Sequence, residues 1–376
     1  MTPYCVMPFV HIKQFTNTIY GPCCEFENQH YTDTDQPQIS DINLLDSFNH
    51  EYFKNIRKEM LNEQIPKGCA RCVGKEKLNT PSYRQWANKQ FKGDISYSIT
   101  QELKEVKALD ISFSNECNLS CRMCQPEYST KWYRIWPEFE KQTKHLNMSL
   151  YHNNVTPWNI QFRDVNKLIN LEFIKIMGGE PFISKEHTEF ILNIPNSIIK
   201  NLSFEYTTNS TIFPNKELEK KLSKAKKIII KLSIDGIGKL NEYIRPGVKW
   251  EQIEDITSKW FSFSKDNNCE VEFAPAWQAL NIHCLDEYID YIKQYGEPWI
   301  GTNRVVTPEP LTIYALPKKY KEKIINQYLK RNDYKQTRNT LIEYLRDDSK
   351  HVDITDFNSF NNEYDSIMNL EKHEIF

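Results

Sequence analysis

The sequence lacks any long apolar segment. No apolar run reaches the roughly 20 residues that a membrane-spanning helix needs. Its start, Met-Thr-Pro-Tyr-Cys-Val-Met-Pro, has neither the charged region nor the apolar region of a secretory signal peptide. We therefore expect a cytoplasmic protein that does not interact with a membrane.

The chain also lacks a strong net charge. Its 48 Lys and Arg residues nearly balance its 50 Asp and Glu residues, so the formal charge is -2. Such a balance gives no global attraction to nucleic acid, and we expect no nucleic-acid partner. The 376 residues, 39% of them hydrophobic, are enough for one large or two ordinary folded domains.

Cysteine is distributed unevenly. Eight of the ten cysteines precede residue 125. In a reducing compartment, cysteines grouped in this way are more often metal ligands than disulfides. This distribution marks the first third of the chain as a metal-rich region.

Three of these cysteines, Cys117, Cys121 and Cys124, form a C-x3-C-x2-C motif. Three thiolates can hold three corners of a four-iron cluster and leave the fourth iron open. A structural zinc site would need a fourth ligand, and no His or further Cys lies close by in sequence. The strand-like run 106–113 precedes the motif, so the cysteines would follow the carboxyl end of a first strand, where α/β barrels keep their active sites.

Strand-like and helical segments alternate from about residue 106 to 309, which is typical of parallel β/α units. Residues 315–376 have a helical pattern. The expected strands are 106–113, 171–177, 202–207, 228–234, 270–276 and 299–307.

Four polar or glycine-rich motifs lie at the ends of three of these strands or shortly beyond them. Each of them alone could be an ordinary helix or turn cap, but four at successive strand ends are improbable by chance. They comprise Gly178, Gly179 and Glu180, then Thr208 and Asn209, then Ser233 and Asp235, and finally Arg245.

Together, these motifs resemble the radical S-adenosylmethionine (SAM) superfamily. The resemblance implies an α/β fold, a partial (β/α)6 TIM-like barrel, in which the three-cysteine motif holds a [4Fe-4S] cluster that binds SAM. It further implies a reductant such as flavodoxin or ferredoxin. The glycine motif would bind the amino group of SAM, Arg245 its carboxylate, and Trp277 or nearby backbone its adenine, with the other strand-end residues lining the site. Two positions depart from the family pattern: Ser210 replaces a glycine, and Met123 replaces an aromatic residue.

The cysteines Cys5, Cys23, Cys69 and Cys72 form a second candidate metal site. Cys5 precedes a hairpin over 8–12 and 20–24, which carries Cys23, and a helix over 44–61 leads to the C-x2-C pair. Four thiolates suit either zinc or a four-iron cluster. The arrangement resembles SPASM and twitch domains, which implies a second, auxiliary [4Fe-4S] cluster. It departs from them because it precedes the barrel, because Thr18 replaces a glycine, and because Cys24 competes with Cys23.

We therefore expect an auxiliary-cluster domain with its connector over 1–95, a barrel over 96–314 and a helical extension over 315–376. The resemblance implies a radical SAM enzyme that cleaves SAM to a 5′-deoxyadenosyl radical and abstracts a hydrogen atom from a peptide or protein residue. One alternative is a small-metabolite substrate, such as a sugar, nucleotide or cofactor precursor. The other is a non-catalytic metal-binding regulatory module.

Overall fold

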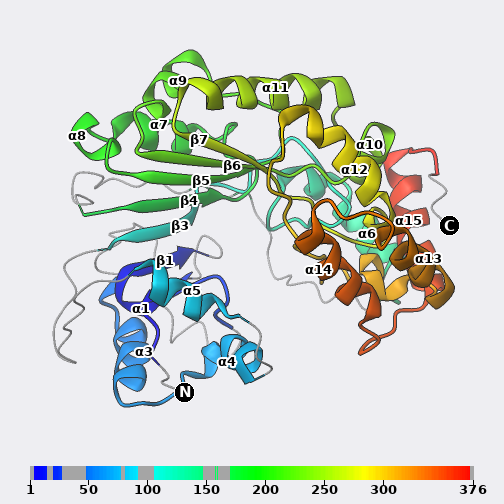
Figure 1. The fold of residues 1–376 in the computed structure, drawn as a ribbon, viewed down its shortest axis with the longest axis horizontal. Helices are drawn as coiled ribbons and strands as arrows, with labels where there is room; N and C mark the ends of the chain where they lie inside the picture. The colour runs from blue at the N-terminus through cyan, green and yellow to red at the C-terminus, as the bar shows by residue number, and fades with distance from the viewer. Residues whose placement is uncertain are drawn as a thin grey trace. The chain divides into compact units, whose positions relative to one another are not determined.

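The computed structural model describes residues 4–14, 20–27, 48–77, 81–91, 106–146, 157, 159 and 170–372. The chain divides into two compact units (Figure 1). The first comprises residues 1–114, 158–206 and 215–228, and the second comprises residues 115–157, 207–214 and 229–376. The three domains expected from the sequence follow other boundaries and stay a prediction.

The first unit is built on a mostly parallel sheet with the strand order β2-β1-β3-β4-β5-β6. Strands β1 and β2 are antiparallel, whereas β1, β3, β4 and β5 pair in parallel. Strand β6 continues into the second unit, where β7 is its neighbour. The strands are β1 (His11–Gln14), β2 (Tyr20–Gly21), β3 (Ala108–Ser112), β4 (Phe173–Met177), β5 (Ser203–Thr208), β6 (Lys227–Leu232) and β7 (Cys269–Phe273).

The expected α/β class with a helical C-terminal region is confirmed. Strands β3 to β7 overlap five of the six predicted strands. The sixth, predicted over 299–307, is reduced to isolated bridges at Ile300 and Arg304. The N-terminal hairpin is confirmed by the β1–β2 pair, but residues Pro8–Val10 belong to a short helix because a proline favours the first helical turn.

One face of the first unit's sheet is apolar and is covered by helix α7 (Lys185–Asn193). His187 on α7 contacts the hydroxyl of Tyr206 on β5 at 3.0 Å, and the ring of Phe190 packs on Phe113. Ser184 begins this helix by accepting a hydrogen bond from the backbone N–H of His187. The unit's other helices are α1 (Met7–Val10), α3 (Glu51–Leu61), η2 (Lys67–Cys69), α4 (Ala70–Lys77), α5 (Tyr83–Gln90), α8 (Asn196–Ile199) and α9 (Lys216–Leu222).

The second unit is mainly helical. Its longest helix, α11 (Trp250–Asp266), buries Ile253, Trp260 and Phe263 at helical spacing. No helix among the described residues has both the length and the apolar composition needed to cross a membrane. The other helices are η3 (Thr130–Arg134), α6 (Trp136–Gln142), α10 (Lys239–Ile244), η5 (Ile282–Cys284), α12 (Leu285–Ile292), η6 (Lys293–Tyr295), η7 (Glu309–Leu311), η8 (Ile313–Ala315), α13 (Lys318–Tyr328), α14 (Lys335–Arg346) and α15 (Ile354–Met368).

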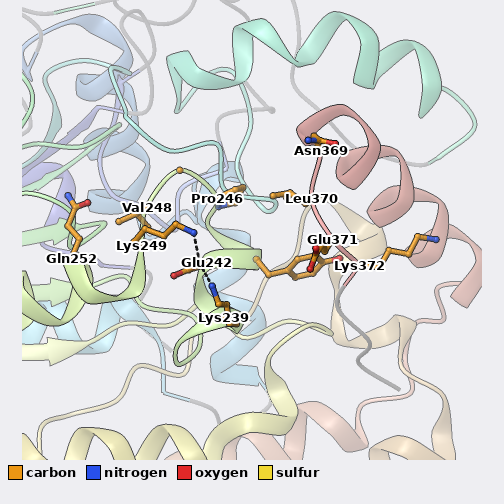
Figure 2. A pocket seen from close by; sticks show the side chains of 12 residues that line it. Lys239, Glu242, Pro246, Val248, Lys249, Gln252, Asn369, Leu370, Glu371 and Lys372 are labelled. Carbon is orange, nitrogen blue, oxygen red and sulfur yellow. Dashed lines mark hydrogen bonds and ion pairs between the residues drawn. The ribbon is translucent and has the colours of Figure 1, made fainter.

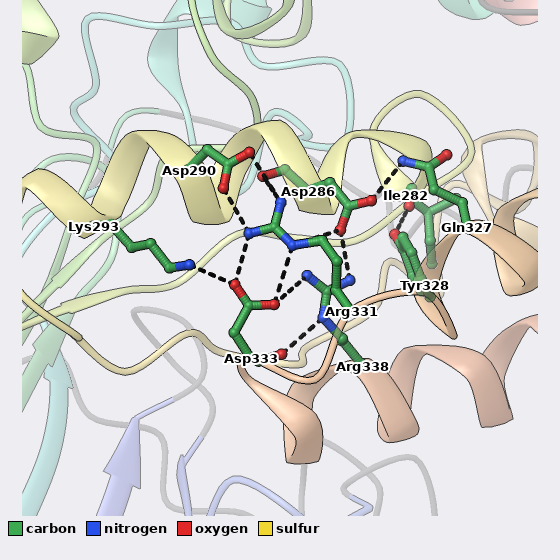
Figure 3. Close-up of polar contacts among 9 residues, drawn as sticks. All are labelled: Ile282, Asp286, Asp290, Lys293, Gln327, Tyr328, Arg331, Asp333 and Arg338. Carbon is green, nitrogen blue, oxygen red and sulfur yellow. Dashed lines mark hydrogen bonds and ion pairs between the residues drawn. The ribbon is translucent and has the colours of Figure 1, made fainter.

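A network of ion pairs fastens the C-terminal helices to α12 (Figure 3). Arg338 is almost fully buried and donates to Asp286 at 2.6 Å and to Asp333 at 2.9 Å. Arg331 donates to Asp290 at 2.6 Å and to Asp333 at 2.7 Å. Asp333 therefore accepts from two arginines, which lowers its proton affinity.

This network predicts a loss of stability in acid. Burial by itself would raise the pKa of Asp333, but donors from Arg331, Lys293 and Arg338 outweigh burial and hold the pKa well below its ordinary value. The stabilisation is therefore present above the unfolded pKa of about 4 and is lost as the pH falls below it. We expect Asp333→Asn to cost about 1–3 kcal/mol near neutral pH and to flatten the fall of the melting temperature in acid.

The matched control is Asp255→Asn, which breaks an exposed pair with Lys259. It should melt in parallel with the wild-type protein at every pH. Melting temperatures from pH 3 to pH 7 test this difference. Equal acid dependence in the Asp333→Asn variant and the wild type would contradict the role given to this carboxylate.

Candidate functional site

The loop that follows β3 folds back on itself so that its three thiols approach one another. The backbone N–H of Cys124 donates to the carbonyl of Cys121 at 2.9 Å. The indole N–H of Trp132 donates to the same carbonyl at 3.0 Å. The backbone N–H of Cys117 donates to the hydroxyl of Thr130 at 3.4 Å. Helix η3 therefore holds the first and second cysteines of the C-x3-C-x2-C motif.

Two side chains donate hydrogen bonds to these sulfur atoms. Arg245 Nη1 lies 3.6 Å from Cys121 Sγ, and Asn209 Nδ2 lies 3.7 Å from Cys117 Sγ. Burial raises the pKa of the Cys121 thiol to about 12, and the nearby guanidinium opposes this rise. N–H groups aimed at sulfur stabilise thiolates and tune iron–sulfur clusters. The chemistry of this donor set therefore fits a cluster held by Cys117, Cys121 and Cys124.

Arg245 is fixed by Asp235. Its Nε donates to Asp235 Oδ2 at 2.7 Å, and the other carboxylate oxygen accepts from the backbone N–H of Ala276 at 2.7 Å. Asn281 donates to the carbonyl of Asp235 at 2.8 Å, which positions this residue further. Burial opposes the charge of Arg245, but the neighbouring Asp235 and Cys121 outweigh it and raise the pKa of Arg245. The arginine therefore stays charged beside the thiols.

The end of β5 joins the cysteine loop through an amide network. Asn209 donates to Asn118 Oδ1 at 2.9 Å, and Asn118 donates to the hydroxyl of Thr211 at 2.9 Å. Thr208 accepts from the backbone N–H of Ser210 at 3.2 Å. Ser210 has φ +63°, in the left-handed region that favours glycine, which is the residue it replaces in the family pattern. Asn209 therefore reaches the loop from a strained turn.

Ser233 and Trp277 take different positions in the second unit. Ser233 is half-buried, and its backbone N–H donates to the carbonyl of Thr208 at 2.8 Å. Trp277 is fully buried, and its indole N–H donates to the carbonyl of Gly301 at 2.8 Å. Its ring packs against Tyr288. The indole of Trp277 is therefore part of the core. The prediction that the backbone near Trp277 binds the adenine of SAM remains a prediction.

The predicted glycine motif lies in the first unit. Gly178 has φ +120°, and a Cβ there would come within 2.7 Å of the carbonyl oxygen of Ser114. Gly179 donates its backbone N–H to the same carbonyl at 3.1 Å. Glu180 is buried and accepts from the backbone N–H of Phe182 at 3.2 Å. Glycine is therefore required here by the turn itself, and the expected contact with the SAM amino group stays a prediction.

The second set of thiols gathers in the first unit. Burial raises the pKa of Cys69 to about 12, and the neighbouring thiols of Cys5 and Cys72 add to the rise. Burial also raises the pKa of Cys23 well above its ordinary value, with Cys5 and Cys69 contributing. The backbone N–H of Glu27 donates to the carbonyl of Gly68 at 2.9 Å, which ties the hairpin to the C-x2-C segment.

Cys24 faces different neighbours from Cys23. Cys24 is exposed whereas Cys23 is buried, and the charged groups that act most on the Cys24 thiol are Asp110, Lys175 and Lys13. The influence of Cys5 and Cys69 falls on Cys23 instead. This difference favours Cys23 as the ligand. Thr18 lies outside the described residues. Within the described part of the chain, no group of three or more His, Cys, Asp or Glu side chains is arranged so that it could hold a metal ion.

Sequence reasoning missed the residues that hold the cysteine loop from the C-terminal helix. Arg122 is fully buried, and it pairs with Asp365 and donates to Asn361 at 3.1 Å. Its guanidinium also lies 3.7 Å from the ring centroid of Tyr243. Tyr364 donates its hydroxyl to the carbonyl of Ser120. Helix α15 therefore positions the loop, although residues 315–376 carry no recognisable motif.

A pocket of about 630 Å³ opens beside Pro246 and Gly247 (Figure 2). Gly247 has φ +113°, and a Cβ there would lie 3.2 Å from Leu119 of the cysteine loop. Lys239 and Lys249 both pair with Glu242 at its rim. None of the predicted site residues lines this pocket.

The Arg245 geometry predicts a selective loss of ligand affinity. If the guanidinium pairs with the SAM carboxylate, Arg245→Ala should weaken SAM binding by about ten- to a hundredfold, since charge-assisted contacts are worth about 1.5–3 kcal/mol. Calorimetric titration with SAM measures this loss.

The comparison variant is Asp235→Asn, which breaks the same ion pair but keeps the guanidinium. Lys249→Ala removes a charge from the same segment and should change the affinity by about twofold at most. Equal affinity in the Arg245→Ala and wild-type proteins would reduce this arginine to a structural partner of Asp235.

No protein-family model matches the chain. The chain is 31% identical over 133 residues to the probable GTP 3′,8-cyclase of Methanocaldococcus jannaschii, covering 35% of this chain and 37% of that protein. It is 26% identical over 199 residues to the probable GTP 3′,8-cyclase of Methanococcus vannielii, covering 51% of this chain and 57% of that protein. The chain thus matches about two to three fifths of the length of these curated relatives.

Two solved structures illustrate the structural comparison. Native anSMEcpe with bound AdoMet gives a TM-score of 0.41 at 16% identity, over 60% of each chain. SuiB of Streptococcus suis bound to S-adenosylmethionine gives 0.37 at 13% identity, over 80% of this chain and 64% of that one. The cysteine loop suggests a class of protein with SAM-dependent iron–sulfur chemistry. The similarity to the two curated cyclases supports the radical SAM superfamily for this chain.

Proposed function

We propose that this protein is a radical SAM enzyme. The observation that carries the proposal is the convergence of Arg245 and Asn209 on the sulfur atoms of Cys121 and Cys117. Three thiols on one loop, with N–H donors aimed at two of them, suit an iron–sulfur cluster that keeps one open iron. When bound, such a cluster supplies the electron that cleaves SAM to methionine and a 5′-deoxyadenosyl radical.

The protein's own residues place SAM and exclude water. Arg245, fixed by the buried carboxylate of Asp235, offers a guanidinium fork to the SAM carboxylate. The end of β5 holds the cysteine loop through Asn209 and Asn118. The resemblance to the radical SAM superfamily assigns the amino group of SAM to Gly178 and Gly179 and its adenine to the backbone near Trp277.

We further propose that Cys5, Cys23, Cys69 and Cys72 hold an auxiliary [4Fe-4S] cluster. Four thiols from the hairpin and the C-x2-C segment influence one another's pKa, which supports a shared site. The electron source would be a small reductant such as flavodoxin or ferredoxin, in the cytoplasm.

The substrate proposed first is a peptide or protein residue. The second candidate is a nucleotide, because both curated relatives are probable GTP 3′,8-cyclases. A regulatory module without turnover is the third possibility. Paired lysines and acids at equivalent positions of strands β3, β4 and β5 favour the first of these.

The test is anaerobic reconstitution with iron and sulfide, followed by reduction in the presence of SAM. We expect 5′-deoxyadenosine and methionine to form in equal amounts. Arg245→Ala should depress this formation at low SAM concentration, and saturating SAM should restore it in part. A fully reconstituted, reduced protein that binds SAM but releases no 5′-deoxyadenosine would reject the enzyme in favour of the regulatory module.

A further inference from the structure

Four charged side chains occupy equivalent positions on four neighbouring strands of the first unit. In the register of the sheet, Lys13 on β1 stands opposite Asp110 on β3, and Asp110 stands opposite Lys175 on β4. Lys175 in turn stands opposite Glu205 on β5. Cross-strand partners lie on the same face of a sheet, so these four side chains form one line of alternating sign. We call it the charged row.

The charged row runs from a buried pair to a more accessible one. Lys13 Nζ lies 2.7 Å from Asp110 Oδ1, and these side chains are 8% and 4% exposed. Lys175 Nζ lies 3.0 Å from Glu205 Oε1, and these are 26% and 12% exposed. Water therefore reaches the Lys175–Glu205 end of the row, whereas the Lys13–Asp110 end is closed to it.

The charged row is not explained by the stability of the sheet. The residues alternating with it, such as Leu109, Ile174 and Phe204, are buried on the opposite, helix-covered face and form the core. Ion pairs removed from water contribute less to stability than apolar residues of similar volume would. Side chains that fill barrel interiors are typically branched and apolar. A row of paired charges on this face therefore points to a binding role.

Aromatic side chains lie next to the charged row. Burial raises the pKa of Tyr83 on α5, and Cys24, Asp110 and Glu205 are among the neighbours that add to the rise. The Tyr83 ring stacks on Trp86 with centroids 4.9 Å apart, and Trp86 is 46% exposed. An accessible aromatic pair beside a polar surface suits the apolar part of a peptide.

We propose that the charged row is the substrate-binding face and that it binds a peptide segment carrying an ammonium group and a carboxylate close together. The carboxylate would meet Lys175, and the ammonium would meet Glu205 at the accessible end of the row. The row has no net charge, because two lysines face two acids, and so it does not complement a polyphosphate. This inference rests on the proposed function, because it names the class of substrate for the proposed radical SAM enzyme.

The test uses the reconstituted full-length protein and two probes, the dipeptide lysyl-glutamate and GTP, titrated by calorimetry. We expect Lys175→Met and Glu205→Gln each to weaken dipeptide binding about tenfold or more, as the loss of a charge-assisted contact should. The matched control is Lys107→Met, which breaks an exposed pair with Glu172 at the end of the same sheet. It should leave dipeptide affinity within about twofold.

Three results would overturn the proposal. The first is that the wild-type protein does not bind the dipeptide. The second is that the Lys175→Met protein binds the dipeptide as tightly as the wild type does. The third is that the protein binds GTP and that Lys175→Met weakens this binding. If a single variant does not fold, the exchange of Lys175→Glu with Glu205→Lys keeps an ion pair. It should still weaken dipeptide binding, because it places a carboxylate beside Asp110. Formation of 5′-deoxyadenosine is also measured without any peptide. This second measurement distinguishes failure of the radical SAM proposal from failure of the peptide-binding proposal.

Discussion

Protein in which Cys117, Cys121 and Cys124 are all replaced by alanine is expected to form no 5′-deoxyadenosine. It should keep about four of about eight irons per chain, since each four-iron cluster depends on its own thiolates. The lost chemistry has no substitute, because acid–base side chains cannot cleave SAM reductively. Iron and sulfide assays after anaerobic reconstitution, together with chromatography of the nucleoside products, measure both effects.

The matched control is Cys269→Ala. Cys269 is half-buried on β7, and its thiol contacts only a neighbouring backbone carbonyl among the hydrogen bonds of the described chain. It should keep all the iron and all the activity. Full iron content in the triple variant would contradict the assignment of the open cluster.

The same triple variant separates the two interpretations of the N-terminal thiols. If Cys5, Cys23, Cys69 and Cys72 hold an auxiliary cluster, the reduced variant should retain a four-iron paramagnetic resonance signal. A sample that gives no paramagnetic resonance signal and contains one zinc per chain would instead show a structural zinc site. Loss of that zinc would unfold the N-terminal segment without any redox signal.

The sequence predicts those parts of the fold that depend on local pattern. Period-2 alternation located β3 to β7 to within a few residues, and β4, β5 and β6 show the matching pattern of burial on one face. The same alternation predicted a strand over 299–307, where only Ile300 and Arg304 form bridges. It also placed Pro8 in a strand, because the helix α1 is a single turn and leaves almost no periodic signal.

The candidate site was predictable where residue type and spacing carry the chemistry. Arg245 and Asp235 were both selected as strand-end groups, and the structure brings them together at 2.7 Å beside Cys121. Their partnership was not predicted, because a ten-residue separation does not reveal which polar groups satisfy each other. For Trp277 the sequence could not show that its indole N–H is used in the core.

The charged row had a signal in the sequence that went unused. Asp110, Lys175 and Glu205 each stand between two apolar residues in the middle of a strand, and each has a counterpart of opposite charge on a neighbouring strand. Lys231 and Glu272 repeat the pattern on β6 and β7, where they pair at 3.9 Å. Reading the strands side by side would have found this repetition, whereas reading each strand alone does not.

The contact between Arg122 and helix α15 had no such signal, because 243 residues separate Arg122 from Asp365. It nevertheless carries the second large prediction. The guanidinium of Arg122 is fully buried, and Asp365 is the carboxylate that neutralises it while also accepting from the Tyr243 hydroxyl at 3.0 Å. Asp365→Ala would leave this charge buried without its partner, and we expect a loss of about 3–5 kcal/mol in the free energy of unfolding. Anaerobic urea denaturation measures it.

Because Arg122 lies between Cys121 and Cys124, part of this loss should appear at the metal site. We expect the Asp365→Ala protein to release iron faster to a chelator than the wild type does. The double variant Arg122→Met with Asp365→Leu removes both charges and should recover most of the stability, since an apolar pair of similar volume replaces a buried ion pair at little cost. Glu343→Ala, which breaks an exposed pair with Arg346, should change the stability by about 0.5 kcal/mol at most. A double variant as unstable as Asp365→Ala would show that α15 holds the loop through shape and hydrogen bonds, and not through the neutralisation of Arg122.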